Sequence, residues 1–274
     1  MIRVALRRPF AGDLGYSGRH VQALQERLNS RMTTAIPPLA PAAAARAAFP
    51  LVVRVPGGRF RMGSAAGRPD ERPLRTLSVG AFELALTPVT CGQYARFVRS
   101  TGAAPPPCFA QSDFSHPEQP VTSVTWFEAA AYAEWLGTVL GGRFRLPSEA
   151  EWERAARGGL HGAATAWGAT PPVGEVPTGS LRGPWRVGRG VPNAYGLFDM
   201  GTIVHEWCGD WYAADAYARA PEGDPRGPAE GLRRASRGGS WRHRVRWSSP
   251  AARSSLPPEF RYSDYGFRIV KEVP

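Results

Sequence analysis

Lysine is almost missing from this sequence. Of its 274 residues 34 are basic and the formal net charge is +11, yet Lys271 is the only lysine. The charge is therefore carried by arginines, and these are scattered along the chain rather than gathered in one run. A protein that binds nucleic acid by charge concentrates Lys and Arg on one face. The scatter favours a GC-rich coding background, such as that of a thermophile, and nucleic acid is not an expected partner.

The sequence also lacks the usual signatures of other protein classes. No apolar run approaches the ~20 residues of a membrane helix, so we expect no membrane span, and the first ten residues do not form a signal peptide. Cys91, Cys108 and Cys208 form no CxxC pair; a Cys91–Cys108 bridge stays open, although buried free thiols are the default expectation. The five histidines show no HExxH spacing, and no P-loop, GxGxxG or GxSxG occurs. The common catalytic motifs are absent.

What is present indicates a globular protein with a large core. Hydrophobic residues make up 43% of the chain, which includes nine Trp. We expect an N-terminal helical segment over residues 1–35, in which Ser17 caps a helix with Val21, Leu24 and Leu28 on one face. That stretch is similar to one helix of peptidoglycan-binding domains, but a docking or oligomerising helix is the better interpretation. Residues 36–48 form a Pro/Ala-rich linker, and the main domain covers 49–274.

Strands are expected first in the main domain. The stretches 49–55 and 58–63 are predicted to pair with each other around a Pro-Gly-Gly turn, and 77–86 continues the strand signal. Three capping boxes then predict helices that begin after Thr90, Thr125 and Ser148 and end at glycines near 102, 141 and 158. The remainder alternates short aromatic segments with turn residues. This order predicts an α+β fold with few helices, small sheets and a high loop content.

Seven phrases in this order carry a resemblance to a known family. They are Phe60-Arg-Met-Gly63, Pro120-Val-Thr-Ser-Val-Thr-Trp126, the stretch from Arg145 to Gly159, Tyr195-Gly-Leu-Phe-Asp-Met-Gly201, Glu206-Trp207, Arg237-Gly-Gly-Ser-Trp241 and Gly266-Phe-Arg268. Together they resemble the formylglycine-generating-enzyme (sulfatase-modifying factor) family. The resemblance implies that family's variant of the C-type lectin fold, in which a few helices pack on small twisted antiparallel sheets.

The resemblance does not carry the family's enzymatic activity over to this chain. Enzymes of the family oxidise a substrate cysteine with copper held by two cysteines downstream of the Gly-Gly-Ser phrase, and no cysteine follows Cys208 here. The related iron-dependent sulfoxide synthases need three histidines that this sequence does not supply. We therefore expect a protein without catalytic residues and without a required cofactor. The alternative is a divergent metal-dependent oxidase of the same family.

One metal site of the family is partly retained. Family members bind calcium through a loop that ends in Trp-Glu-Trp, and alignment on Glu206-Trp207 places Asp199, Thr202, Val204 and Glu206 at the ligand positions. Asp199 and Glu206 would offer carboxylates and the other two carbonyl oxygens, as a hard cation requires. The loop departs from the family pattern at residues 201–205. The alternative is that Asp199 caps the turn and Glu206 pairs with a buried arginine.

The C-terminal segment 237–270 resembles the variable region of proteins that diversity-generating retroelements rewrite. Randomising the first two bases of AAC codons reaches Arg, His, Val, Ser, Phe, Tyr and Asp, and of the residues that we assign to the variable blocks only Trp247 lies outside that set. These residues are Arg242, His243, Arg244, Val245, Arg246, Trp247, Ser248, Ser254, Ser255, Phe260, Arg261, Tyr262, Ser263, Asp264 and Tyr265. Arg and aromatic side chains on a rigid scaffold suit ligand binding.

The sequence thus predicts a non-enzymatic protein with a diversified recognition surface. Its expected ligand is an unidentified protein or a surface glycan. The resemblance implies a phage or prophage setting. We expect cytoplasmic synthesis, followed by display on a phage particle or cell surface by a route other than a signal peptide.

Overall fold

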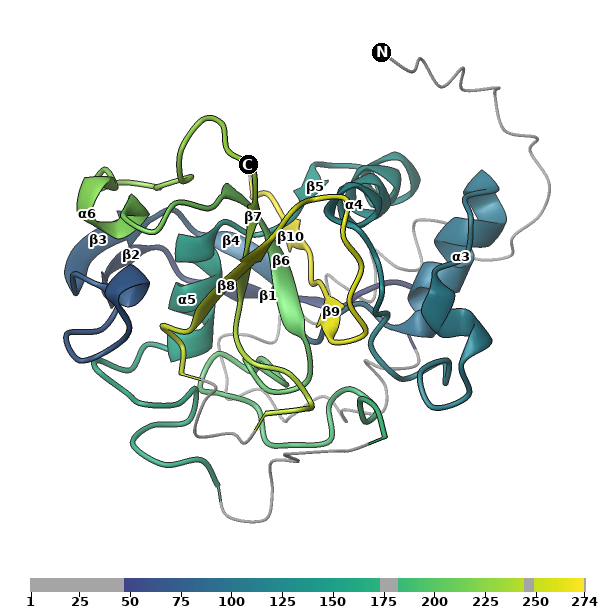
Figure 1. Ribbon diagram of the computed structural model, residues 1–274, viewed down its shortest axis with the longest axis horizontal. Helices are drawn as coiled ribbons and strands as arrows, with labels where there is room; N and C mark the ends of the chain where they lie inside the picture. The colour runs from purple at the N-terminus through teal and green to yellow at the C-terminus, as the bar shows by residue number, and fades with distance from the viewer. Residues whose placement is uncertain (1–46, 173–181, 244–248, 274) are drawn as a thin grey trace. The chain divides into compact units, whose positions relative to one another are not determined.

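The computed structural model describes residues 47–172, 182–243 and 249–273 (Figure 1). The expected N-terminal helical segment 1–35, nearly all of the linker 36–48 and residues 244–248 of the variable region lie outside these ranges. Within them, no helix has the length and apolar content needed to cross a membrane.

All three helices predicted from capping boxes are present. They are α3 (Cys91–Thr101), α4 (Trp126–Leu140) and α5 (Glu149–Arg157). In each, the hydroxyl of the N-cap residue accepts a hydrogen bond from the third helical N–H, whose own side chain bonds back to the N-cap backbone. Gly102 and Gly158 end α3 and α5 in the left-handed conformation, which glycine adopts without strain. Local chemistry alone therefore sets these helix starts.

The pairing predicted for the first strands is wrong. β1 (Val52–Val55) pairs with β4 (Phe82–Ala85), whereas β2 (Gly58–Met62) pairs with β3 (Arg75–Val79). The four strands form one long antiparallel ribbon that keeps its register through a bend at residues 56–58 and 80–81. A Cβ at Gly57 would lie 2.7 Å from the backbone nitrogen of Ala81, so the two segments of the ribbon approach each other closely at the bend. The Pro-Gly-Gly phrase bends the chain instead of reversing it.

Two four-stranded sheets organise the rest of the domain. The first has the order β1-β4-β10-β5 and places β10 (Val270–Lys271) between β4 and β5 (Phe144–Arg145). The second has the order β8-β7-β6-β9, in which β9 runs parallel to β6. Its strands are β6 (His205–Trp211), β7 (Arg234–Arg237), β8 (Arg253–Leu256) and β9 (Tyr265–Gly266). Short helices η1 (Pro69–Glu71), η2 (Pro107–Ala110) and α6 (Ala216–Arg219) lie in the connections.

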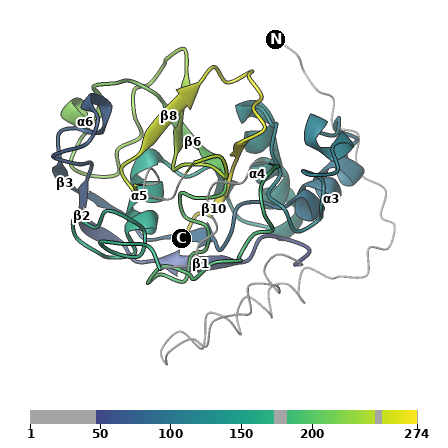
Figure 2. The same cartoon turned by 60° about the horizontal axis from the view of Figure 1, so that its bottom comes forward.

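Figures 1 and 2 agree on how these parts are arranged. The β2–β3 ribbon and α6 lie at one end of the domain, α3 and α4 lie at the other, and the β8-β7-β6-β9 sheet stands between them. An aromatic core fills the α3–α4 end, where Tyr94 stacks on Tyr132 at 5.6 Å and both rings contact Phe267. The small antiparallel sheets, few helices and extensive loops confirm the predicted α+β fold class with a high loop content.

The second core is built around α5 and contains buried charges. All nine residues of α5 are buried, and the helix packs against β2, β6 and β7. Arg237 of β7 is fully buried and bonds Glu153 at 2.5 Å, while Arg253 of β8 bonds Glu149 at 2.7 Å. Buried charges are tolerated only when such partners satisfy them. These ion pairs join β7 and β8 to α5.

Candidate recognition surface

The β8-β7-β6-β9 sheet carries two of the predicted variable blocks. Ser254 and Ser255 lie on β8 opposite Ser236 and Ala235, and Tyr265 lies on β9 opposite His205. Figure 1 shows β8 and β9 on opposite sides of β6. The hydroxyls of Tyr265 and Ser254 are nevertheless 2.7 Å apart, because the tyrosine side chain reaches across the sheet. The sheet therefore connects the block at 254–255 with the block at 260–265.

The block that begins at Arg242 meets the block at 260–265 directly. Nη2 of Arg242 donates to the hydroxyl of Ser263 at 2.6 Å, and Nε1 of Trp241 donates to the carbonyl of Ser263 at 3.3 Å. The hydroxyl of Ser240 lies 3.2 Å from the carboxylate of Asp264. The described part of the first block and the third block thus form one continuous surface.

The N-terminus of α4 holds the remaining part of this surface. The backbone N–H of Trp126 donates to the carbonyl of Pro258, and that of Ser123 donates to the carbonyl of Tyr262. The guanidinium of Arg261 binds both carboxylate oxygens of Glu128. Backbone and ion-pair contacts therefore immobilise the loop, and its side chains need little further ordering on binding a ligand.

Exposure divides the predicted residues into three groups. Arg242, Phe260, Arg261 and Tyr262 are exposed; His243, Ser254, Ser255 and Ser263 are half-buried; Asp264 and Tyr265 are buried. Arg244, Val245, Arg246, Trp247 and Ser248 lie outside the described residues. The eight exposed and half-buried residues are called the candidate face below. Asp264 and Tyr265 support it from beneath.

The structure adds two residues that sequence reasoning missed. His205 lies under the candidate face, with its ring 5.2 Å from that of His243 and 4.9 Å from that of Tyr265. Burial lowers the pKa of His205 to about 4, against the opposing effect of Asp264. Phe127, at the start of α4, is 55% exposed and stands edge-on to Trp126. The sequence showed only that Phe127 follows the helix cap Thr125, and its exposure came from the structure.

All four predicted calcium ligands are buried, and one of them, Glu206, belongs to a buried ion pair with Arg268. Glu206 is fully buried, and its two oxygens accept hydrogen bonds from Arg268 at 2.6 and 2.9 Å and from Nε1 of Trp152 at 2.7 Å. Asp199 accepts a hydrogen bond from the backbone of Gly188, and burial raises its pKa to about 6. A carboxylate already neutralised by Arg268 does not fit a calcium ligand. The set of Asp199, Thr202, Val204 and Glu206 stays a prediction, and the geometry of Glu206 argues against it.

The three cysteines differ in their surroundings. Cys91, Cys108 and Cys208 are all buried free thiols. The thiol of Cys208 is fully buried, and burial raises its pKa well above the usual value. The thiols of Cys91 and Cys108 contact each other, and their hydrogen bond lowers the pKa of Cys108 to about 7. All three cysteines precede the Gly-Gly-Ser phrase, so none lies at the positions of the ligand pair of the family's oxidases.

Comparison with known proteins places this geometry in context. The family model of the sulfatase-modifying factor enzyme 1-like domain matches residues 39–273. A formylglycine-generating enzyme from Streptomyces coelicolor is 34% identical over 292 aligned residues, which cover 81% of this chain and 89% of that enzyme.

Two solved structures share the fold. PvdO from Pseudomonas aeruginosa superposes with a TM-score of 0.72 at 26% identity, over 84% of this chain and 97% of that one. Treponema denticola variable protein 1 superposes with a TM-score of 0.70 at 25% identity, over 81% and 95%. The similar proteins thus include both an enzyme and a variable protein, and the fold does not choose between them.

Proposed function

Because the chain belongs to the family of sulfatase-modifying factor enzyme 1-like domains, we propose that it uses the fold of that family as a rigid scaffold for ligand binding and not for catalysis. In this proposal the candidate face, together with residues 244–248, forms the recognition surface. The protein would be the variable protein of a diversity-generating retroelement, carried by a phage or prophage.

One observation carries the proposal. The bond between Arg242 and Ser263 joins two blocks that the codon pattern had marked separately. The exposed side chain of Arg242 and the half-buried side chain of Ser263 are thus neighbours on a frame held by buried ion pairs. Diversity at such positions changes a binding surface without changing the core beneath it.

The chemistry of the face favours a protein or glycan ligand over a polyanion. The charge of Arg261 is bound by Glu128, and Nε of Arg242 lies 3.9 Å from Asp264. The exposed aromatic rings of Phe260 and Tyr262 are 45% and 46% accessible. Rings of this kind dominate binding energy in protein interfaces, and Tyr adds a polar group at its tip.

The neighbouring DNA tests the retroelement directly. We expect a near-copy of the 3′ end of the gene that differs only at adenines, beside a gene for a reverse transcriptase. Flanking DNA without such a repeat would remove this part of the proposal.

Substitution tolerance tests the recognition surface. Phe260→Ser, Tyr262→Ser and Arg242→Ser should each change the free energy of unfolding by less than about 0.5 kcal/mol. Tyr265→Ser, at a buried position of the same block, is the matched control and should cost about 3 kcal/mol or more. Similar losses at exposed and buried positions would contradict the proposal.

The alternative function is that of a divergent oxidase, which the 34% identity to the Streptomyces coelicolor enzyme favours. It predicts that the protein loaded with copper converts the cysteine of a peptide into formylglycine, which mass spectrometry detects. Conversion above the level of copper alone would establish the oxidase and overturn the binding proposal.

A further inference from the structure

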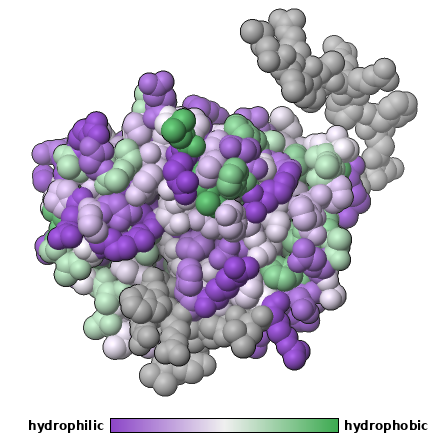
Figure 3. Space-filling view, viewed as in Figure 1, coloured by the Kyte–Doolittle hydropathy of each residue, from purple (hydrophilic) through white to green (hydrophobic). Residues whose placement is uncertain are grey.

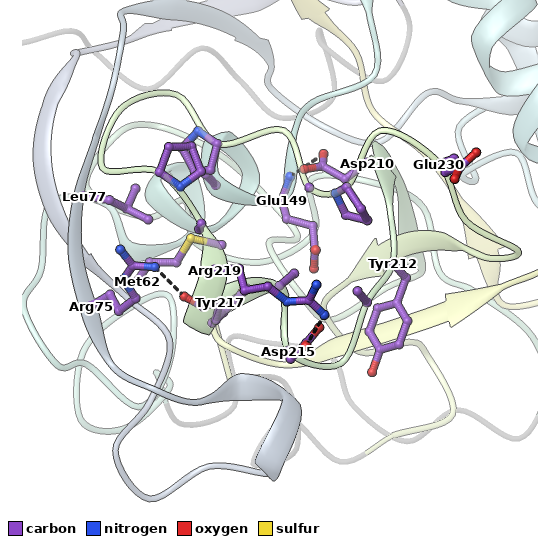
Figure 4. A pocket seen from close by; sticks show the side chains of 18 residues that line it. Met62, Arg75, Leu77, Glu149, Asp210, Tyr212, Asp215, Tyr217, Arg219 and Glu230 are labelled. Atoms are coloured by element: carbon purple, nitrogen blue, oxygen red, sulfur yellow. Dashed lines mark hydrogen bonds and ion pairs between the residues drawn. The ribbon is translucent and has the colours of Figure 1, made fainter.

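A cavity of about 350 Å³ lies apart from the candidate face. Its wall is formed by the β2–β3 ribbon, the start of α5, the end of β6, α6 and the loop after α6. Figure 4 shows Met62, Arg75 and Leu77 on one side, Tyr212 and Glu230 on the other, and Glu149 between them. Most of the lining is apolar, and the volume matches the lower end of the range for small-molecule sites.

Most charged groups of this wall already have partners. Both oxygens of Glu149 are bound by Arg253, at 2.8 and 2.7 Å. Asp215 pairs with Arg219, and the guanidinium of Arg75 donates to the carbonyl of Tyr217 at 2.7 Å. None of these groups needs a ligand to satisfy it.

Asp210 is different. Its side chain is only 4% exposed and projects from the end of β6 into the wall of the cavity. Oδ2 accepts a hydrogen bond from the backbone N–H of Glu149 at 3.0 Å, whereas Oδ1 accepts none from the described residues. The carboxyl group of Asp210 is therefore almost buried and accepts one hydrogen bond, which compensates little of the cost of its charged form.

The surroundings keep Asp210 protonated near neutral pH. Burial raises its pKa to about 8; the carboxylates of Glu149 and Glu151 on α5 act in the same direction, and Arg226 opposes them. Two further groups interact electrostatically with Asp210. They are the guanidinium of Arg234 on β7 and the thiol of Cys208 on β6. A cation beside Oδ1 would compensate the charged form and release this proton.

We propose that the cavity binds a small organic ammonium ion, with its nitrogen against Oδ1 of Asp210 and its apolar part against Met62, Leu77 and Ala216. The exposed carboxylate of Glu230 at the rim adds attraction for a cation. The site is independent of the candidate face, so its failure leaves the proposed function untouched.

Calorimetry with 2-phenylethylammonium and its neutral isostere 2-phenylethanol tests the site on the full chain. The ammonium ion should bind and release a proton at pH 7, so the measured heat should depend on the ionisation enthalpy of the buffer. The alcohol should bind at least tenfold more weakly. Equal binding of both probes, or no binding of the ammonium ion, would overturn the proposal.

Variants assign the site to this cavity. Asp210→Asn keeps an oxygen for the N–H of Glu149 and should weaken ammonium binding at least tenfold, with no proton release. Glu259→Gln removes an exposed charge outside the cavity wall and should bind like the wild type. Ala216→Phe fills the cavity without a change of charge and should abolish binding. If both Asp210→Asn and Ala216→Phe bind like the wild type, the site lies elsewhere and the inference is wrong.

Discussion

The hydroxyl of Tyr265 lies 2.7 Å from that of Ser254, although β9 and β8 are the two edges of their sheet. The tyrosine ring crosses the intervening strands and contacts the ring of Trp207 at 5.1 Å. One buried side chain therefore links two blocks of the candidate face from below. The sheet, rather than the loops, determines how these two blocks lie relative to each other.

The first prediction concerns this link. Tyr265→Phe keeps the ring and removes the hydroxyl, so the free energy of unfolding should fall by about 1 kcal/mol. Tyr262→Phe, in the same block but exposed, is the control and should leave it unchanged. Denaturant titration measures both, and equal effects would show that the bond to Ser254 contributes nothing.

The second prediction concerns the pair of Arg268 and Glu206, both fully buried. Arg268→Met leaves the carboxylate of Glu206 buried without a cation and should destabilise the fold by about 3–5 kcal/mol. Arg143→Met is the control, because the side chain of Arg143 is 83% exposed and pairs with Glu272 at the surface. Loss of this pair should cost less than about 1 kcal/mol. Comparable losses in the two variants would contradict the assignment of Arg268 as a core residue.

The third prediction follows from His205. Its pKa is lowered to about 4 in the folded state, from an ordinary value of 6.5, mainly by burial. Above pH 6.5 the side chain is neutral in both the folded and unfolded states. As the pH falls from 6.5 towards 4, only the unfolded state takes up the proton, so stability is lost at up to about 1.4 kcal/mol per pH unit. His205→Gln should show a flatter pH profile of unfolding free energy in that window. An unchanged slope would mean that the histidine is protonated within the fold.

The fourth prediction concerns calcium. A calcium ion coordinated by Glu206 must displace the guanidinium of Arg268, which bonds both carboxylate oxygens. We therefore expect EDTA to leave the unfolding temperature unchanged and calcium to produce no saturable increase. A saturable increase that is lost in Asp199→Asn would establish the site predicted from the sequence.

Local signals in the sequence were sufficient for the helices. Thr90, Thr125 and Ser148 each start a helix through contacts within four residues, so no tertiary information was needed. The strand partners were different, because Val55 and Gly58 find theirs at Phe82 and Val79. Pairing over such a separation depends on the bend at Gly57, which the sequence does not distinguish from a reversing turn.

The residues of the candidate face were selected from the sequence because randomised AAC codons reach their amino-acid types, and their role in binding stays a prediction. The burial of Asp264 and Tyr265 was not accessible from the sequence, since it depends on their tertiary contacts with Ser240 and Ser254. The cavity also escaped prediction, because its wall combines distant segments. Its one signal was Asp210, an acid in a phrase bounded by two tryptophans, Trp207-Cys-Gly-Asp-Trp211.

The position of β10 has a genetic consequence. This strand comes from the last residues of the chain and occupies the interior of a sheet, between β4 and β5. A premature stop or frameshift anywhere in residues 242–265 removes it and leaves β4 and β5 without their common neighbour. In the proposed function, the segment that is rewritten is thus followed by residues that complete a central sheet. We therefore expect a truncated product that lacks β10 not to fold, whereas substitutions at the first two bases of AAC codons create no stop codon and leave β10 in place.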